Sequence, residues 1–261
     1  MKKNSVFLLI AMLCIGFTSC QKDNNLGQTA PTIPPQESFI IDFQDLSTGK
    51  TEATQLNAFF AGINVLTWNT VLVSTLAIPV TAFKASFNQE ATFADGTWTW
   101  AYNFDGAGGI NHSARLEAEV IGTASINWSM YISKDGSYED FLWFTGTSNV
   151  DSRSGTWTLM LEPESPKEFL SITYDLDNSN EGTIKYLNVL ENNPNNGSYI
   201  EYGHTGTEAF DVFYDIFKSE DSDLINIEFN KNTKAGRVKS LQHFGDESWH
   251  CWNGANEDVD C

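Results

Sequence analysis

The sequence predicts a mainly β fold, an antiparallel meander of about 10–12 strands that forms a closed or half-open barrel. One N-terminal apolar helix is expected to cover or plug it. Three observations predict this fold. Apolar and polar residues alternate with a period of two from residue 91 onwards. Several short motifs occur twice in the same order, and an uncharged segment with helical spacing precedes the strands.

The repeated motifs indicate a duplicated unit of four short strands. Gly96-Thr97-Trp98 returns as Gly155-Thr156-Trp157, and Thr145-Gly146-Thr147 returns as Thr205-Gly206-Thr207. Motifs that recur in the same order at a nearly constant spacing are typical of repeated structural units. The two copies are residues 96–147 and 155–207.

Alternation defines the strands on either side of these motifs. Asp95-Gly96 is a strong hairpin signal between Ala91–Ala94 and Thr97–Phe104. Phe39–Phe43 reads as a first strand before the helix, and two or three more strands follow the second copy. Short polar turns without helical crossovers predict antiparallel pairing of sequence neighbours. The expected late strands are 209–217, 224–229 and 236–240.

The expected helix follows Thr51-Glu52, which has the pattern of an N-cap with an acidic first turn. Apolar residues then keep helical spacing from Leu56 towards Leu76, and Pro79 should end or kink the helix. No charged residue occurs between Ala53 and Phe83. Asparagines and threonines interrupt the apolar run, which argues against a transmembrane helix. We therefore expect a helix that is covered on most sides.

The start of the chain predicts export. Lys2 and Lys3 precede an apolar run too short to span a bilayer, which is typical of a signal peptide. Small residues before Cys20 resemble the lipobox of bacterial lipoproteins, which implies cleavage after residue 19 and acylation of Cys20. The alternative is an ordinary cleavage site with a stray cysteine. The following residues 20–38 are rich in proline and read as a lipidated flexible tether, which leaves 39–261 as a single β-barrel-like domain.

The resemblance also implies a location. Gln21 is not the aspartate of inner-membrane retention signals, which favours an outer-membrane lipoprotein. Lys22-Asp23 resembles part of the acidic surface-export tag of Bacteroidota lipoproteins, so the periplasmic face and the cell surface both remain open. The mature chain carries a formal charge of −21, two units below the −19 of the whole chain. Such a surface repels nucleic acid.

Cysteine use fits an oxidising compartment. With Cys20 acylated, Cys251 and Cys261 remain as a pair in the mature chain, which predicts a disulfide. The tail 242–261 lacks periodicity and is expected to fold back over one end of the barrel, closed by this disulfide. No cofactor or metal is expected, because no paired histidine or Cys-x-x-Cys spacing occurs.

Three further resemblances concern the whole domain. Gly-x-Trp resembles the opening motif of lipocalins and implies a lipocalin-like barrel, and a meander with an apolar helix is similar in outline to outer-membrane lipoprotein carriers. A third resemblance is carried by Val65–Thr70, Phe141–Asn149, Gly236–Ser240, Trp249–Trp252 and Cys261. In these segments the chain resembles an uncharacterised family of Bacteroidota outer-membrane lipoproteins. The resemblance implies the lipid anchor and the single β domain and carries no activity.

Catalytic motifs are absent from the sequence. No Gly-x-Ser-x-Gly elbow occurs, and Asp177–Gly182 begins like a calcium loop but has Asn188 at its twelfth position. A glycosidase needs two facing carboxylates, of which Glu201 is the least implausible. We therefore expect a protein that is not an enzyme, and keep a secreted hydrolase as the least favoured reading.

Aromatic residues are the remaining indication of function. Inside the fold they serve as core, and around a cavity they bind apolar ligands or stack on sugars. The leading hypothesis is a lipid-anchored outer-membrane protein that binds a small apolar or aromatic-stacking ligand. The alternative is a surface interaction, adhesion or carbohydrate-binding module. The candidate ligand-binding residues are Trp100, Trp128, Trp143, Tyr186 and Tyr202.

Overall fold

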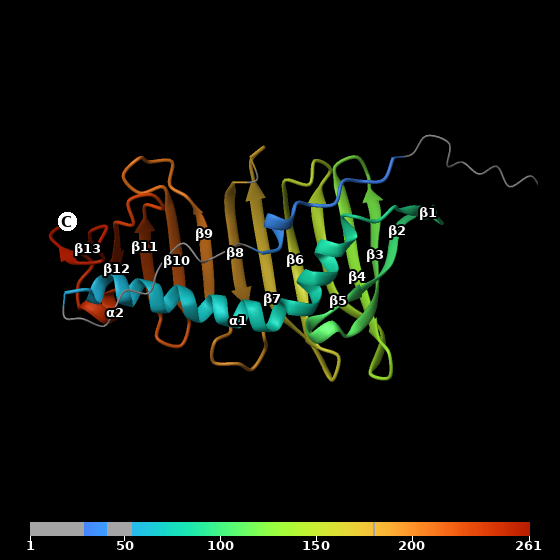
Figure 1. The fold of residues 1–261 in the computed structure, drawn as a ribbon, viewed down its shortest axis with the longest axis horizontal. Helices are drawn as coiled ribbons and strands as arrows, with labels where there is room; N and C mark the ends of the chain where they lie inside the picture. Colours follow the sequence, from blue (N-terminus) through green and yellow to red (C-terminus); the bar gives the residue numbers. More distant parts are fainter. Residues whose placement is uncertain (1–28, 41–53, 180) are drawn as a thin grey trace, which may run out of the picture.

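The computed structural model describes residues 29–40, 54–179 and 181–261 and shows a mainly β chain with one long helix. Fourteen antiparallel strands form one open sheet in which sequence neighbours lie side by side (Figure 1). The strands are β1 Thr92–Ala94, β2 Thr97–Asp105, β3 Asn111–Ile121, β4 Ser125–Lys134, β5 Tyr138–Asn149, β6 Ser154–Glu162, β7 Ser165–Leu176, β8 Gly182–Asn188, β9 Tyr199–His204, β10 Val212–Lys218, β11 Asp223–Phe229, β12 Gly236–Lys239, β13 His250–Trp252 and β14 Asp258–Val259.

The antiparallel meander with one N-terminal helix is confirmed, and the expected barrel closure is not found in the described part of the chain. β1 pairs with β2 and β14 with β13, so the two edges of the sheet do not meet. Figure 1 shows β1 and β13 at opposite ends of the molecule. Closure requires edge strands long enough to pair, whereas the two edges here have three and two residues. Such short edges also limit pairing with other chains.

Alternation fixes which face of the sheet is buried. A row of large side chains crosses six neighbouring strands in register and lies on the face that carries the helix. Along each strand, the neighbours of these residues point to the opposite face of the sheet and are mostly polar, as period-two alternation predicts. The row consists of Trp100, Leu116, Met130, Phe144, Leu159 and Leu170, all of them buried.

The duplicated unit corresponds to β2–β5 and β6–β9, which continue as one sheet. The repeated glycines nevertheless have different roles. A Cβ on Gly146 would stand 2.2 Å from Trp157, so this glycine allows the Trp157 ring to pack directly on the backbone of β5. Gly206 instead follows β9 with a φ of +70° and open space around it. In the first copy Trp98 is half-buried and its ring lies tilted against Phe93, with ring centroids 4.8 Å apart.

The long helix α1, Leu56–Ser86, runs across the strands on one face of the sheet (Figure 1). It continues through Pro79 instead of ending there, and Figure 1 shows its C-terminal part turning away from the line of its N-terminal part. A proline inside a helix removes one backbone hydrogen bond and bends the axis. Its sheet-facing side chains are buried, and they include Ala61, Val65, Leu72, Leu76 and Phe83.

The start of α1 is capped from the other end of the chain. The carboxylate of Asp258 accepts hydrogen bonds from the backbone N–H groups of Leu56 (3.1 Å) and Asn57 (3.0 Å). The side-chain amide of Asn57 donates to the Cys251 carbonyl at 3.0 Å. Asp258 therefore satisfies two N–H groups that would otherwise lack partners and places negative charge at the helix N-terminus. The cap expected at Thr51-Glu52 lies outside the described residues.

The C-terminal tail has more structure than its sequence pattern predicts. It forms a short helix α2, Leu241–Phe244, and the last two strands of the sheet. Cys251 and Cys261 are joined as the expected disulfide, with their Cα atoms 5.2 Å apart. Trp252 is buried, whereas Trp249 lies on the outward face beside Arg237. The tail extends the sheet instead of covering a barrel end.

Residues 29–40 lie against the sheet, although the sequence predicts a tether up to residue 38. A short 3₁₀ helix η1, Gln36–Ser38, leads to Phe39, whose side chain is fully buried. Trp157 Nε1 donates to the Ser38 carbonyl at 3.1 Å, and the Ser152 hydroxyl donates to the Thr32 carbonyl at 2.6 Å. Phe39 and Ile40 are not in a strand, and the rest of the expected strand 39–43 lies outside the described residues.

Candidate binding surface

The five aromatic residues predicted to bind a ligand belong to the core. Trp100, Trp128, Trp143 and Tyr186 are buried and Tyr202 is partly buried. Trp128 Nε1 donates to the Ser148 hydroxyl at 3.0 Å, and the Trp100 and Trp128 rings lie 5.9 Å apart. None of the five lines the surface cavities described below. The structure therefore gives no support to an interior ligand pocket among these side chains.

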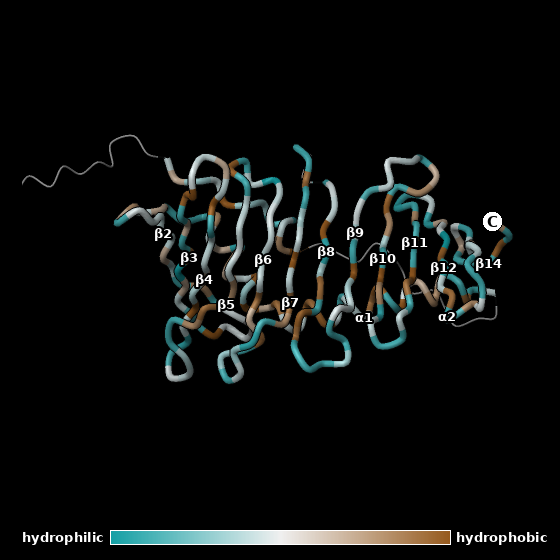
Figure 2. The backbone as a smooth tube through the Cα atoms, turned by 180° about the vertical axis from the view of Figure 1, so that it is seen from behind, coloured by the Kyte–Doolittle hydropathy of each residue, from teal (hydrophilic) through white to brown (hydrophobic). Residues whose placement is uncertain are grey.

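A surface groove of about 270 Å³ lies between α1 and two loops that follow β8 and β10. The loop between β8 and β9 and the turn between β10 and β11 form one side, and the middle of α1 forms the other. These three segments are far apart in the sequence. Figure 2, which views the sheet from behind, shows hydrophilic loops beside the hydrophobic strand segments that approach α1.

The apolar part of the groove consists of Trp68, Val71 and Phe217. Trp68 is half-buried: it packs partly on the core and reaches the groove with the rest of its side chain. Among the described residues no aromatic ring stacks on it. A half-exposed indole offers an apolar face for C–H groups and a ring nitrogen that donates a hydrogen bond.

The polar part of the groove is rich in groups without partners. Within the described residues, the side chains of Asn195, Lys218, Glu220 and Asp221 form no hydrogen bond or ion pair. The other polar side chains of the groove, Asn188, Ser198 and Thr67, already bond neighbouring groups of the protein. The side chains of Asn195, Lys218, Glu220 and Asp221 can therefore form hydrogen bonds with a ligand or with water. Amides and carboxylates beside an aromatic ring are typical of sites for hydroxyl-rich molecules.

Hydrogen bonds fix the two loops relative to each other. The Ser198 and Ser219 hydroxyls lie 2.8 Å apart, and Ser219 N–H donates to the Ser198 hydroxyl at 3.0 Å. The Ser219 hydroxyl also donates to the Pro194 carbonyl at 3.1 Å. This side of the groove is thus held in place without a ligand, which reduces the entropy lost on binding.

The outward face of α1 adjoins the groove and is apolar as well. Its exposed side chains are uncharged up to Lys84, and several are large and hydrophobic. A helix that is apolar on both faces is usually covered on both. Among the described residues, α1 is the one helix with the length and composition needed to cross a membrane. The exposed large residues on it are Leu56, Ile63, Leu66, Val71 and Val73.

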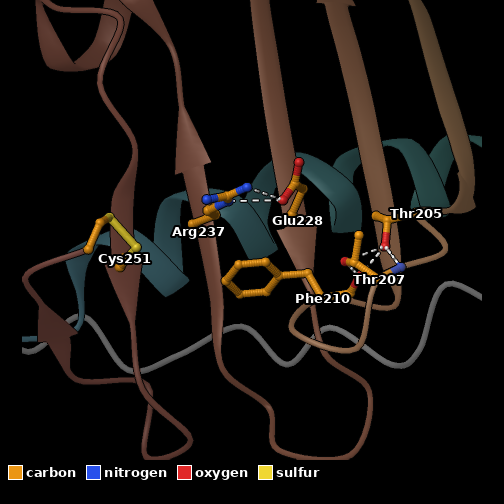
Figure 3. Close-up of polar contacts among 7 residues, drawn as sticks. Thr205, Thr207, Phe210, Glu228, Arg237 and Cys251 are labelled. Carbon is orange, nitrogen blue, oxygen red and sulfur yellow. Dashed lines mark hydrogen bonds and ion pairs between the residues drawn. A yellow bond between two sulfur atoms is a disulfide. The ribbon is translucent and has the colours of Figure 1, made fainter.

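The opposite face of the sheet carries paired charges. Arg237 binds one carboxylate oxygen of Glu228 through Nε (2.9 Å) and Nη2 (2.6 Å), and its guanidinium lies over the rings of Phe210 and Trp249. Figure 3 shows Arg237, Glu228 and Phe210 in front of the strands, with α1 behind them. The Thr205 and Thr207 hydroxyls donate to the Phe210 carbonyl, as Figure 3 also shows. These groups satisfy one another and stabilise the strands.

A second depression on that face, of about 410 Å³, borders Tyr131, Arg115 and Asp140. The Arg115 guanidinium already lies 4.4 Å from the Tyr131 ring centroid and pairs with Asp140 at 3.1 Å. A larger depression of about 520 Å³ at the β4–β5 turn is lined mainly by polar turn residues. Neither combines a free aromatic ring with unpaired polar groups, so the groove at Trp68 is the best candidate site.

Catalytic and metal-binding arrangements find no support. Glu201 pairs with Lys185 at 3.3 Å and stands beside Asp215 in the sheet, so the two carboxylates share a flat face and do not oppose each other across a cleft. The Asp177 carboxylate of the calcium-like segment accepts hydrogen bonds from the Ser179 and Glu181 N–H groups, as in a polar turn, instead of standing free for a cation. Among the described residues no cluster of His, Cys, Asp or Glu could hold a metal ion.

Sequence reasoning missed the groove. Trp68 lies in the segment Val65–Thr70 and is not among the five aromatic residues predicted to bind a ligand. The available signal was a tryptophan flanked by Thr67 and Asn69 inside an otherwise apolar helix. Its loop partners could not be inferred, because only the fold brings them to α1. Compared with known protein families, curated proteins and solved structures, the chain matches none of them.

Proposed function

We propose that this chain is a lipid-anchored, non-enzymatic protein of the outer membrane that binds a small hydroxyl-rich ligand, of saccharide type, in the groove beside Trp68. The observation that carries the proposal is a half-buried indole without a stacking partner, next to unpaired amide and carboxylate groups. The anchor is supported by the signal-peptide pattern and by Cys20.

The chemistry of the groove favours a saccharide over a purely apolar ligand. A sugar ring has an apolar face of C–H groups that stacks on an aromatic ring, and hydroxyls at its edge that bond amides and carboxylates. Asn195, Glu220 and Asp221 are exposed beside the groove, where their amide and carboxylate groups can bond the hydroxyls of a sugar; an apolar ligand would leave these groups unused. The volume of about 270 Å³ is slightly below the roughly 300–1,000 Å³ of typical ligand pockets, which favours a ligand of about one sugar ring.

Titration with N-acetylglucosamine, glucose and maltose, followed by protein NMR, tests the binding. Trp68→Ala should weaken the binding at least about tenfold, because an aromatic residue at the centre of a site carries much of its affinity. Trp98→Ala, which removes a half-buried tryptophan on β2, serves as the matched control and should leave the affinity unchanged. Equal affinities of Trp68→Ala and the native protein, or no binding of any of the three sugars, contradict the proposal.

The anchor is tested separately. The intact mass of protein extracted from the membranes of its own host should show a chain that begins at an acylated Cys20. An unmodified chain that begins at another residue contradicts the lipid anchor and leaves the groove hypothesis standing.

A further inference from the structure

The outward face of α1 is a continuous uncharged surface. Leu66 is 43% exposed and Val73 is 56% exposed, yet no charged residue occurs between Ala53 and Phe83. Uncharged residues, four of them serine or threonine, follow each other along this face at spacings of three and four, as on one side of a helix. Its length of 31 residues corresponds to about 46 Å. The members of this row are Ile63, Thr67, Thr70, Ser74, Ala77 and Thr81.

The hydroxyl groups on this face are satisfied by the helix itself. Thr67 donates to the Ile63 carbonyl and Thr70 to the Leu66 carbonyl, both at 2.8 Å. Ser74, Thr75 and Thr81 bond the preceding turn in the same way, at 2.7–3.0 Å. Hydroxyls that return to their own backbone need no outside partner, which is how serine and threonine are accommodated in membrane helices. The serine and threonine hydroxyls of this face can therefore contact hydrocarbon without being left unpaired.

The chain approaches the membrane anchor on this same side of the sheet. Phe39 stacks on Phe83 of α1 with ring centroids 5.1 Å apart, and Trp157 holds the Ser38 carbonyl. Figure 1 shows the N-terminal segment and α1 on one face of the sheet. Nine residues lead from Cys20 to Thr29, where the described chain begins, and they reach at most about 30 Å. A lipid on Cys20 would thus keep this face close to the bilayer.

Two alternatives fit less well. A second copy packed on α1 alone would cover about 460 Å² per partner, taking a helix 46 Å long and about 10 Å wide, whereas a stable dimer needs about 800 Å². Attraction to anionic lipid headgroups is opposed by the net charge of the mature chain, −21. The interaction that best fits α1 is therefore burial of its apolar side chains in the apolar part of a membrane.

We propose that the outward face of α1 lies in the interfacial region of the bilayer and forms a second membrane contact beside the lipid on Cys20. The orientation rests on the proposed anchor; the contact itself rests on the chemistry of α1. Helices of this kind bind by placing apolar side chains about 5–10 Å into the boundary between headgroups and acyl chains. The groove at Trp68 would then open at headgroup height, where an indole is favourably placed.

Vesicle binding without the anchor tests the contact. The chain from residue 20 with Cys20→Ser is mixed with phosphatidylcholine vesicles, and the bound fraction is measured by flotation. The chain with the native α1 sequence should bind. The double variant Leu66→Glu/Val73→Glu should bind at least about tenfold more weakly, because the added charges on the outward face of α1 would have to be desolvated on entering the membrane. The matched control Leu224→Glu/Val150→Glu alters residues of similar exposure, 42% and 51%, away from α1 and should bind like the native chain.

Circular dichroism and sugar titration of each variant separate the outcomes. Because Leu66 and Val73 do not line the groove, saccharide affinity should stay unchanged in the α1 variant. Equal vesicle binding by native chain and α1 variant, or no binding by either, overturns the membrane contact. A concentration-dependent dimer that only the α1 variant abolishes, seen by analytical ultracentrifugation, also overturns it and assigns the face to a second copy. If the native chain binds vesicles as expected but binds none of the three sugars, the proposed function alone is contradicted and the membrane contact stands.

Discussion

At the scale of single residues, a contact across about 200 positions of the sequence joins Asp258 to the first turn of α1. Its carboxylate bonds two backbone N–H groups, and its own N–H donates to the Thr54 carbonyl at 2.6 Å. Gln55 precedes the helix without a side-chain cap of its own. The stability of the helix start thus depends on a residue about 200 positions away, held by β13 and the disulfide.

Asp258→Ala should lower the free energy of unfolding by about 1–2 kcal/mol, the usual effect of losing an N-cap. Urea unfolding followed by circular dichroism measures the change. Asp260→Ala removes an exposed carboxylate of the same tail and should change the stability by less than about 0.5 kcal/mol. Equal losses in the two variants would show that Asp258 does not cap α1.

Asp215 gives a residue-scale prediction that depends on pH. Burial raises the pKa of Asp215 above its ordinary value of 3.8, the hydrogen bond from Asn226 (2.6 Å) opposes this, and the neighbouring Glu201 adds to it. A carboxyl group with a raised folded-state pKa stabilises the fold when protonated, and that contribution is lost as the pH rises through the folded-state pKa.

Asp215→Asn should therefore raise the unfolding midpoint at pH 7, since the amide keeps an acceptor for Asn226 without a charge to desolvate. The difference from the native protein should shrink as the pH falls towards 3.8, because the native carboxyl is then protonated too. Thermal unfolding from pH 3.5 to 7 measures this. A variant that is less stable at pH 7, or a difference that grows in acid, contradicts this account of Asp215.

At the scale of elements, the N-terminal segment 29–40 packs between α1 and the sheet through Phe39. Phe39 contacts Phe83 of the helix and Phe144 and Trp157 of the sheet, with ring centroids 4.9–5.8 Å apart. The Phe39 carbonyl also accepts a bond from the Tyr186 hydroxyl at 3.4 Å. A single side chain thus joins three elements.

Phe39→Ala should cost about 3–5 kcal/mol, as for other fully buried phenylalanines, and should expose residues 29–40 to proteolysis. Denaturant unfolding and limited proteolysis report the two effects. Phe87→Ala is the control, because Phe87 is 38% exposed at the end of α1 and its loss should cost far less. If both variants were equally stable, the segment 29–40 would not be part of the folded domain.

At the scale of the whole molecule, local patterns in the sequence predict the strands well and the long-range contacts poorly. Alternation and Asp95-Gly96 predict the first hairpin, which forms with positive φ angles at both turn residues. β13 and β14 have too few residues to show a period. The cap by Asp258 and the docking of Phe39 depend on segments that meet only in the fold.

The same distinction applies to the candidate site. Aromatic residues such as Trp100 and Trp128 are conspicuous in the strands, but the register turns them towards α1 and fills the interior. Composition alone does not separate an aromatic core from an aromatic pocket. Trp68 reaches the groove because α1 crosses the ends of β8–β11, an arrangement that no local pattern encodes.

The central claim is that this domain binds at its surface beside α1 and not in its interior. ¹⁹F NMR of protein labelled with 5-fluorotryptophan reports on all eight tryptophans at once. On titration with N-acetylglucosamine, glucose or maltose, we expect the Trp68 resonance to shift while those of Trp100, Trp128 and Trp143 stay in place. A shift of the three buried tryptophans with an unmoved Trp68 would contradict the claim and assign binding to the space between α1 and the sheet.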